Sequence, residues 1–111
     1  MVREFLVREG RETDFERIFG IEGIWPELLK CSRQYLGSLL QLESQAERRY
    51  RLQDWWLSHL GFEAFRRIHQ LDCNKLEQFI RREELVIREW FLGAFYLDDP
   101  DSEEGDELVP S

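Results

Sequence analysis

The residues with the clearest potential for chemistry lie in one stretch, residues 48–80. It holds both histidines of the chain, His59 and His69, with Asp54 a few residues before them. A neutral imidazole takes up a proton near pH 7, so His69 is a candidate general base. Asp54 is a candidate base, or a residue that orients one. The competing interpretations are a buried histidine bonded to backbone or to a nearby acid, and a strand-end acid that caps the next helix.

Aromatic side chains are candidates to line a pocket around these groups. Aromatic residues make up 14% of the chain, which indicates either a dense core or a cavity and partner surface rich in rings. A tyrosine hydroxyl at such a site can donate to a bound carbonyl or quinone. Packing in the core is the alternative interpretation of every one of them. The candidates for substrate binding are Trp56, Tyr35, Trp25, Phe62 and Phe65.

Several kinds of site are not expected. His59 and His69 are ten residues apart, or about 15 Å along a helix, which is too far for them to share a metal ion. The two cysteines, Cys31 and Cys73, have neither a CxxC nor a zinc-binding spacing, which favours a reducing cytoplasm. No serine, cysteine or lysine stands beside a base as an activated nucleophile, and no glycine-rich phosphate loop occurs. We therefore expect no metal and no cofactor.

The charge of the chain is unevenly distributed. Its 111 residues suffice for one domain, and its net charge is −8. Residues 98–111 contain seven of the 23 acidic residues and no basic one, which leaves 16 acidic and 15 basic residues elsewhere. A near-neutral body argues against binding to nucleic acid. The charged first residues are not typical of a signal peptide, and no apolar run has the length of a membrane span. We expect one domain at residues 1–97, a solvated acidic tail at 98–111, and a cytoplasmic protein.

Apolar periodicity predicts which elements position these residues. Thr13 and Glu16 have the spacing of a capping box, and Ser58 is a plausible N-cap. Residues 81–88 are ambiguous between helix and strand. The expected elements are strands at residues 2–7, 35–42, 49–57 and 90–97, a broken helix at 14–19 and 26–32, and a long helix from after Ser58 to about residue 80.

The order β-α-β-β-α-β predicts an α+β fold of the ferredoxin-like class, with two helices on one face of an antiparallel sheet. Trp55 and Trp56 then point to opposite faces of the third strand. The second and last strands are apolar on both faces, whereas a solvated face would alternate. We therefore expect two copies to pack through their open sheet faces as a homodimer. The assigned faces are Tyr35 and Leu39 against Leu36, Leu40 and Leu42, and Trp90, Leu92, Ala94 and Tyr96 against Phe91, Phe95 and Leu97.

A set of residues spread over most of residues 3–97 resembles the antibiotic biosynthesis monooxygenase-like proteins. The segment from Asp54 through Trp56, Ser58 and Phe62 to Phe65 is its most specific part. Gln34 departs from the glycine that is common before the tyrosine in that family. The other matching positions are Gly20, Trp25, Leu28, Leu29, Ser32, Tyr35, Leu36, Gly37, Tyr50, Leu57, His69, Glu84, Gly93 and Phe95.

The resemblance implies a dimeric α+β barrel with a small cavity between helices and sheet. It implies a cofactor-independent monooxygenase for a planar phenol or quinol, with His69 as base and Trp56, Tyr35 and Asp54 shaping the pocket. A haem-degrading branch of the family uses an Asn on the first strand and a Trp and a His on the long helix. This chain has Phe65 and a residue near Lys75 at the helical positions and no Asn on the strand. One alternative is a dimer of the same fold that has a binding or structural role and no catalytic turnover. Another is a haem-binding protein that uses other ligands.

Overall fold

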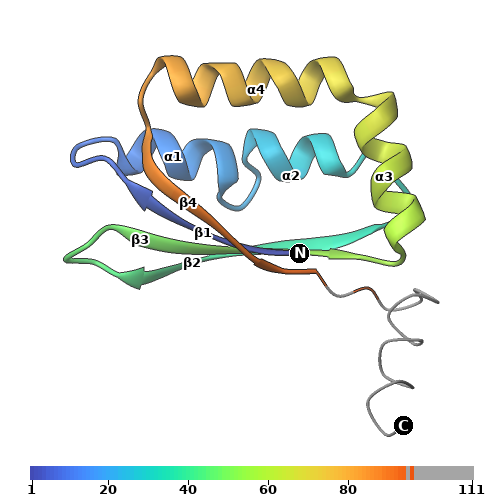
Figure 1. Ribbon diagram of the computed structural model, residues 1–111, viewed down its shortest axis with the longest axis horizontal. Coiled ribbons are helices and arrows are strands. Elements are labelled where there is room, and N and C mark those ends of the chain that lie inside the picture. The colour runs from blue at the N-terminus through green and yellow to red at the C-terminus, as the bar shows by residue number, and fades with distance from the viewer. Residues whose placement is uncertain (95, 97–111) are drawn as a thin grey trace, which may run out of the picture.

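The computed structural model describes residues 1–94 and residue 96. A four-stranded sheet carries four helices on one side, as Figure 1 shows. The predicted tail at residues 98–111 lies outside the described residues. The elements in chain order are β1 (Val2–Val7), α1 (Glu12–Phe19), α2 (Ile24–Leu29), β2 (Tyr35–Ser44), β3 (Arg49–Trp56), α3 (His59–Ile68), α4 (Gln70–Arg82) and β4 (Val86–Gly93).

The sheet confirms the predicted α+β class. Its strands run in the order β2-β3-β1-β4, and every neighbouring pair is antiparallel. The two central strands, β1 and β3, are not consecutive in the chain, because α1, α2 and β2 come between them. This arrangement is consistent with a ferredoxin-like fold. Among the described residues, no helix is long and apolar enough to cross a membrane.

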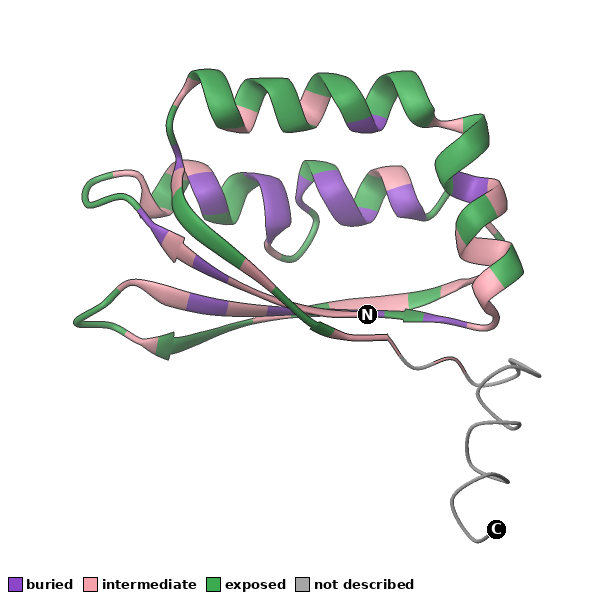
Figure 2. Ribbon diagram, viewed as in Figure 1, coloured by how far each residue is buried: buried purple, intermediate pink, exposed green. Residues whose placement is uncertain are grey.

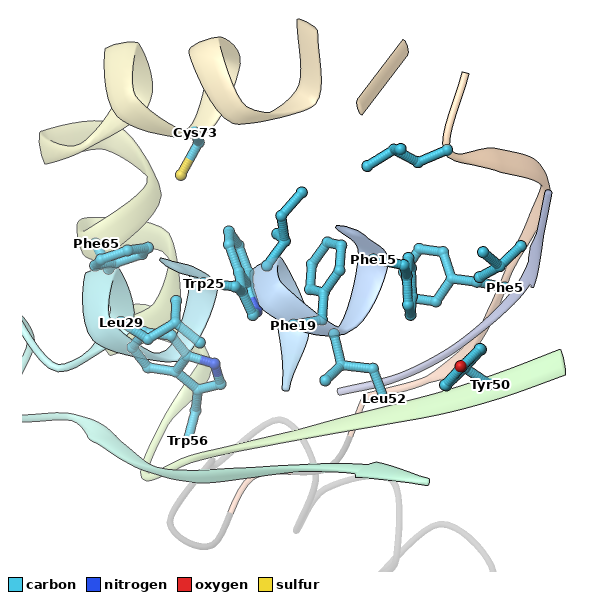
Figure 3. Packing of buried hydrophobic residues seen from close by; sticks show 13 residues of the cluster. Phe5, Phe15, Phe19, Trp25, Leu29, Tyr50, Leu52, Trp56, Phe65 and Cys73 are labelled. Atoms are coloured by element: carbon cyan, nitrogen blue, oxygen red, sulfur yellow. The ribbon is translucent and has the colours of Figure 1, made fainter. Parts of the chain in front are cut away.

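The inner face of the sheet and the helices together form the core (Figure 2). The rings of Phe5 and Phe15 lie 5.2 Å apart, and those of Phe15 and Tyr50 lie 4.9 Å apart. Figure 3 shows these rings between helix α1 and strand β3. Trp56 is 1% exposed and Trp55 is 42% exposed, which confirms that they face opposite sides of β3. Helix α4 is the most exposed helix in Figure 2, and Cys73 is its one buried residue.

A bulge changes the faces of β2. Tyr35 pairs with Trp56 and Gly37 pairs with Trp55, so Leu36 is an extra residue between them. The bulge is possible because Gly37 adopts φ 150°, a conformation that favours glycine. Tyr35 therefore shares the inner face with Ser38 and not with Leu39. The predicted grouping of Tyr35 with Leu39 is wrong, because the inserted residue shifts the two-residue alternation.

The predicted long helix is two helices. His69 has φ −106° and ψ 29°, and α3 and α4 meet there at a wide angle in Figure 1. Hydrogen bonds continue across the bend, from the His69 N–H to the Phe65 carbonyl at 2.9 Å and from the Cys73 N–H to the His69 carbonyl at 3.0 Å. The bend lets Phe65 pack on Trp56 at the end of the sheet while Cys73 packs over the α2 side. One straight helix cannot cover both places.

Four further local predictions can be compared with the structure. Ser58 is the N-cap of α3, and its hydroxyl accepts the Gly61 N–H at 3.0 Å, as predicted. The predicted capping box is wrong, because α1 begins at Glu12 and Thr13 is already inside its first turn. Helix α2 covers residues 24–29 and not 26–32. The last strand, described at Val86–Gly93, begins before the predicted residue 90, and residues 95 and 97 of its predicted end lie outside the described residues. Strand β4 begins early because Val86 pairs with Val7 at the far end of β1.

Candidate functional site

A buried carboxylate, Asp54, is the centre of the polar interior. The alternation of β3 places it on the inner face between Leu52 and Trp56, and it is 2% exposed. The indole N–H of Trp25 in α2 donates to Asp54 Oδ2 at 3.1 Å. The hydroxyl of Ser38 in β2 donates to Asp54 Oδ1. Both carboxylate oxygens therefore already accept a hydrogen bond, as a buried charge requires.

The hydrogen-bonded chain extends from Ser38 to Tyr35. The Tyr35 hydroxyl lies 2.5 Å from Ser38 Oγ, and it donates because the Ser38 proton goes to Asp54. Burial raises the pKa of the Tyr35 phenol, and the nearby Asp54 charge raises it further. Tyr35 is thus a neutral donor near pH 7. The bulge at Gly37 makes this contact possible, because it turns Tyr35 to the same face as Ser38.

Arg3 brings a positive charge to the same region. It lies on the inner face of β1 with Phe5 and Val7, and its side chain is 17% exposed. Its Nη2 is 3.8 Å from Asp54 Oδ2, and its Nη1 is 3.5 Å from Glu89 Oε2. The guanidinium carbon lies 5.3 Å from the centre of the Trp25 ring and 5.4 Å from that of Phe5. Arg3 is therefore held by one buried and one half-exposed carboxylate and by aromatic faces.

A cavity of about 420 Å³ lies beneath α4, between that helix and the strands β1 and β4. Its walls combine apolar side chains with five charged ones, and Arg3 is the charged group on its β1 wall. Burial raises the pKa of the Cys73 thiol, so this lining residue is a neutral thiol. In Figure 3 the Cys73 sulfur points from α4 toward the rings of Trp25 and Phe65. The apolar lining includes Phe5, Phe19, Trp25, Leu76, Ile80 and Val86.

Of the predicted aromatic site residues, Trp25 alone lines this cavity. Tyr35, Phe62 and Phe65 instead surround Trp56 beneath α3, with ring centres 5.5, 5.2 and 5.3 Å from the Trp56 ring. The indole N–H of Trp56 is enclosed and has no hydrogen-bond partner among the described residues. Trp56, Tyr35, Phe62 and Phe65 are thus packed against one another at the end of the sheet. Tyr35 joins this cluster to Asp54 through Ser38.

His69 lies apart from the cavity. Its ring packs 4.8 Å from that of Phe65, and its Nδ1 is 3.7 Å from Asp72 Oδ2. It is not part of the cavity lining, and no hydrogen bond or ion pair between described residues joins it to Asp54. The two predicted catalytic residues are therefore not brought together. His59, in turn, pairs with Glu63 at 2.9 Å.

Sequence reasoning missed Arg3. The signal is present in β1, because alternation groups Arg3 with Phe5 and Val7 on the face that must be buried. A basic residue on such a face is rare and needs a partner, which points to a site. Its partners, Asp54 and Glu89, are distant in the chain, so the sequence did not show which acids it meets.

The described residues contain no group of three or more His, Cys, Asp or Glu side chains that could hold a metal ion. The polar groups that meet here are instead one guanidinium, one buried carboxylate and neutral donors. Such a set can bind and orient an oxygen-bearing ligand. In comparisons with protein-family models, curated proteins and solved structures, nothing matched this chain.

Proposed function

We propose that the chain binds a small planar phenol or quinol beneath α4 and oxidises it as a cytoplasmic, cofactor-independent monooxygenase. The resemblance to the antibiotic biosynthesis monooxygenase-like proteins suggests this activity. The observation that supports it best is the cavity of about 420 Å³, whose lining joins aromatic and aliphatic side chains to the guanidinium of Arg3. Pockets for small molecules have volumes of about 300–1,000 Å³, and the volume of this cavity lies in that range.

The proposed chemistry requires the substrate to be its own reductant. An ionised phenol transfers electrons to O₂. One oxygen atom forms a bond to a ring carbon, and the other leaves as water together with two hydrogens of the substrate. Arg3 would favour the phenolate, because a nearby positive charge stabilises the ionised form. Trp25 and Phe19 would exclude water from the reacting ring.

Asp54 fits a positioning role in this proposal. Its carboxylate contacts Trp25 and faces Arg3, and both of these residues line the cavity. The assignment of His69 as the base rests on the sequence alone, since its ring is outside the cavity lining. A reaction in the cavity and a reaction at His69 predict different effects of substitutions on oxygen uptake, and the experiment below distinguishes them.

The alternative is a protein of the same fold that binds a small molecule without turnover. One observation favours it: both oxygens of Asp54 already accept hydrogen bonds, from Trp25 and Ser38. A carboxylate held in this way is a poor general base. Binding without oxygen uptake would support this alternative.

We also propose that the protein is a homodimer formed through the open face of the sheet. Leu39 pairs with Gln53, and Trp55 occupies the same outer face of β3. Both Leu39 and Trp55 are more than 40% exposed, which is unusual for large apolar side chains on a sheet. An ion pair of Arg51 with Glu4, at 2.8 Å, lies among them and would fix the register of two copies.

The test of function is oxygen uptake with a panel of quinols and polycyclic phenols. The purified chain is compared with Arg3→Met and His69→Ala, and with Arg17→Met as a control for loss of one exposed arginine on α1. Uptake that is lost in Arg3→Met and kept in His69→Ala supports the cavity as the reaction site. Uptake that is lost in His69→Ala alone moves the chemistry to the bend between α3 and α4. No uptake with any compound, from a well-folded protein, rejects the monooxygenase.

A further inference from the structure

The guanidinium of Arg3 has donors to spare. Its Nε and Nη2 are enclosed, yet they have no hydrogen-bond partner among the described residues. Asp54 is 3.8 Å away and already accepts from Trp25 and Ser38. A buried donor that stays unpaired costs free energy, so a turn of the guanidinium that brings one of these donors to a ligand oxygen would be stabilising.

Glu89 is a weak and replaceable partner for Arg3. Its carboxylate lies 3.5 Å from Arg3 Nη1, at the limit of a hydrogen bond, and its side chain is 49% exposed. It projects from β4 at the wall of the cavity. A half-exposed carboxylate can turn to solvent at little cost. It therefore occupies the place that a ligand carboxylate would take.

The cavity as a whole has an excess of positive charge. Arg3, Arg81 and Arg88 line it together with Glu77 and Glu89, so basic residues outnumber acidic ones by one in a chain of net charge −8. Within the described part of the chain, neither Arg81 nor Arg88 forms an ion pair. An excess of positive charge in the lining attracts an anion.

We infer that the ligand of this cavity is an aromatic anion, a planar ring with a carboxylate that pairs with Arg3 in place of Glu89. The aromatic and aliphatic walls take the ring, and the guanidinium takes the carboxylate. This inference rests on the proposed function, because it takes the cavity to be the substrate site. It narrows the substrate from phenols in general to hydroxy-aromatic acids.

The test compares two probes that share one ring system and differ at the carboxyl group, the anion 3-hydroxy-2-naphthoate and its neutral methyl ester. Binding is measured by isothermal titration calorimetry. Occupancy of the cavity is measured separately in a Cys31→Ser background, where alkylation of Cys73 by N-ethylmaleimide is followed by mass spectrometry. Cys73 lines the cavity and Cys31 is exposed, so protection of Cys73 reports a ligand beneath α4.

We expect the carboxylate to bind about tenfold or more tightly than the ester, the usual range for a hydrogen bond to a charged group. Arg3→Met should remove this preference, whereas Arg17→Met should keep it. Glu89→Gln removes the competing carboxylate without touching the core. It should tighten the naphthoate about two- to fivefold and leave the ester unchanged. Glu27→Gln, an exposed acid on α2, is the matched control.

The outcomes separate this inference from the function on which it rests. Equal binding of ester and carboxylate, with Cys73 protected by both, overturns the preference for an anion and leaves the cavity as a phenol site. Unchanged naphthoate binding in Glu89→Gln overturns the proposed exchange of carboxylates, even if Arg3→Met fails to fold. No protection of Cys73 by either probe overturns both the inference and the proposed site.

Discussion

Replacing Asp54 by asparagine should lower the free energy of unfolding substantially, although the two side chains have nearly the same size. The asparagine oxygen can still accept from either Trp25 or Ser38, but its amide cannot accept from the other. Hydrogen bonds to a charged acceptor contribute about 1 kcal/mol more than neutral ones, and Arg3 also loses its buried counter-ion at 3.8 Å. We expect a loss of about 2–4 kcal/mol in the free energy of unfolding. A domain of this kind typically has about 5–15 kcal/mol, so the variant should still fold.

A double-mutant cycle with Trp25→Phe tests the reasoning more sharply. Phenylalanine keeps most of the ring and removes the N–H that donates to Asp54, which should cost about 1–3 kcal/mol. Because the two single changes remove the same bond, the double variant should lose about 1–2 kcal/mol less than their sum. Unfolding in urea is followed by circular dichroism, at two protein concentrations to detect any linked dimerisation.

Asp14→Asn is the control for this cycle. Asp14 is a half-exposed acid on α1 that pairs with Arg11 at 3.0 Å and Arg17 at 3.6 Å. Its replacement should cost less than about 1 kcal/mol. Additive losses for Asp54→Asn and Trp25→Phe, within about 0.5 kcal/mol, would refute the proposed network. So would an Asp54→Asn variant as stable as Asp14→Asn.

Three further predictions follow from the fold. Trp55→Glu should convert the dimer to a monomer in analytical ultracentrifugation while circular dichroism stays unchanged; a wild-type monomer would end the proposal of a dimer. Burial raises the pKa of the Tyr35 and Tyr50 hydroxyls, so the unfolded chain ionises first. Their contribution to stability is therefore complete below about pH 10 and is lost as the pH rises above it, and Tyr35→Phe should flatten this fall in urea midpoints. Cys31 should react with N-ethylmaleimide at least tenfold faster than Cys73, which is buried and has a raised pKa. Equal rates would show that α4 moves away from the core often enough to expose Cys73.

The sequence was a good guide at several positions where one local rule applied. Strand β1 covers the predicted residues 2–7, because its β-prone residues end at the charged turn that follows Val7. Ser58 caps α3 because its hydroxyl accepts a hydrogen bond from an N–H in the first turn of that helix, a contact that requires no distant segment. The opposite exposure of Trp55 and Trp56 follows from strand geometry alone.

The sequence was a poor guide wherever packing between distant segments decided the outcome. The apolar stripe of residues 62–80 is continuous, so nothing local marks the bend at His69. The bend arises because Phe65 and Cys73 pack at different places on the core. The bulge before Gly37 is of the same kind, since it depends on the register between β2 and β3.

By itself, the sequence determined the α+β class and the order in which strands and helical segments follow one another, because these depend on periodicity along the chain. Only the tertiary structure decided which polar groups meet. Arg3, Asp54 and Glu89 come from three strands, and their contacts depend on the sheet order β2-β3-β1-β4 and on α4 lying over β1 and β4. Periodicity along the chain does not indicate which residues of different strands lie close together. For that reason the predicted pair of His69 and Asp54 gave way to Arg3 and Asp54 as the polar centre of the candidate site.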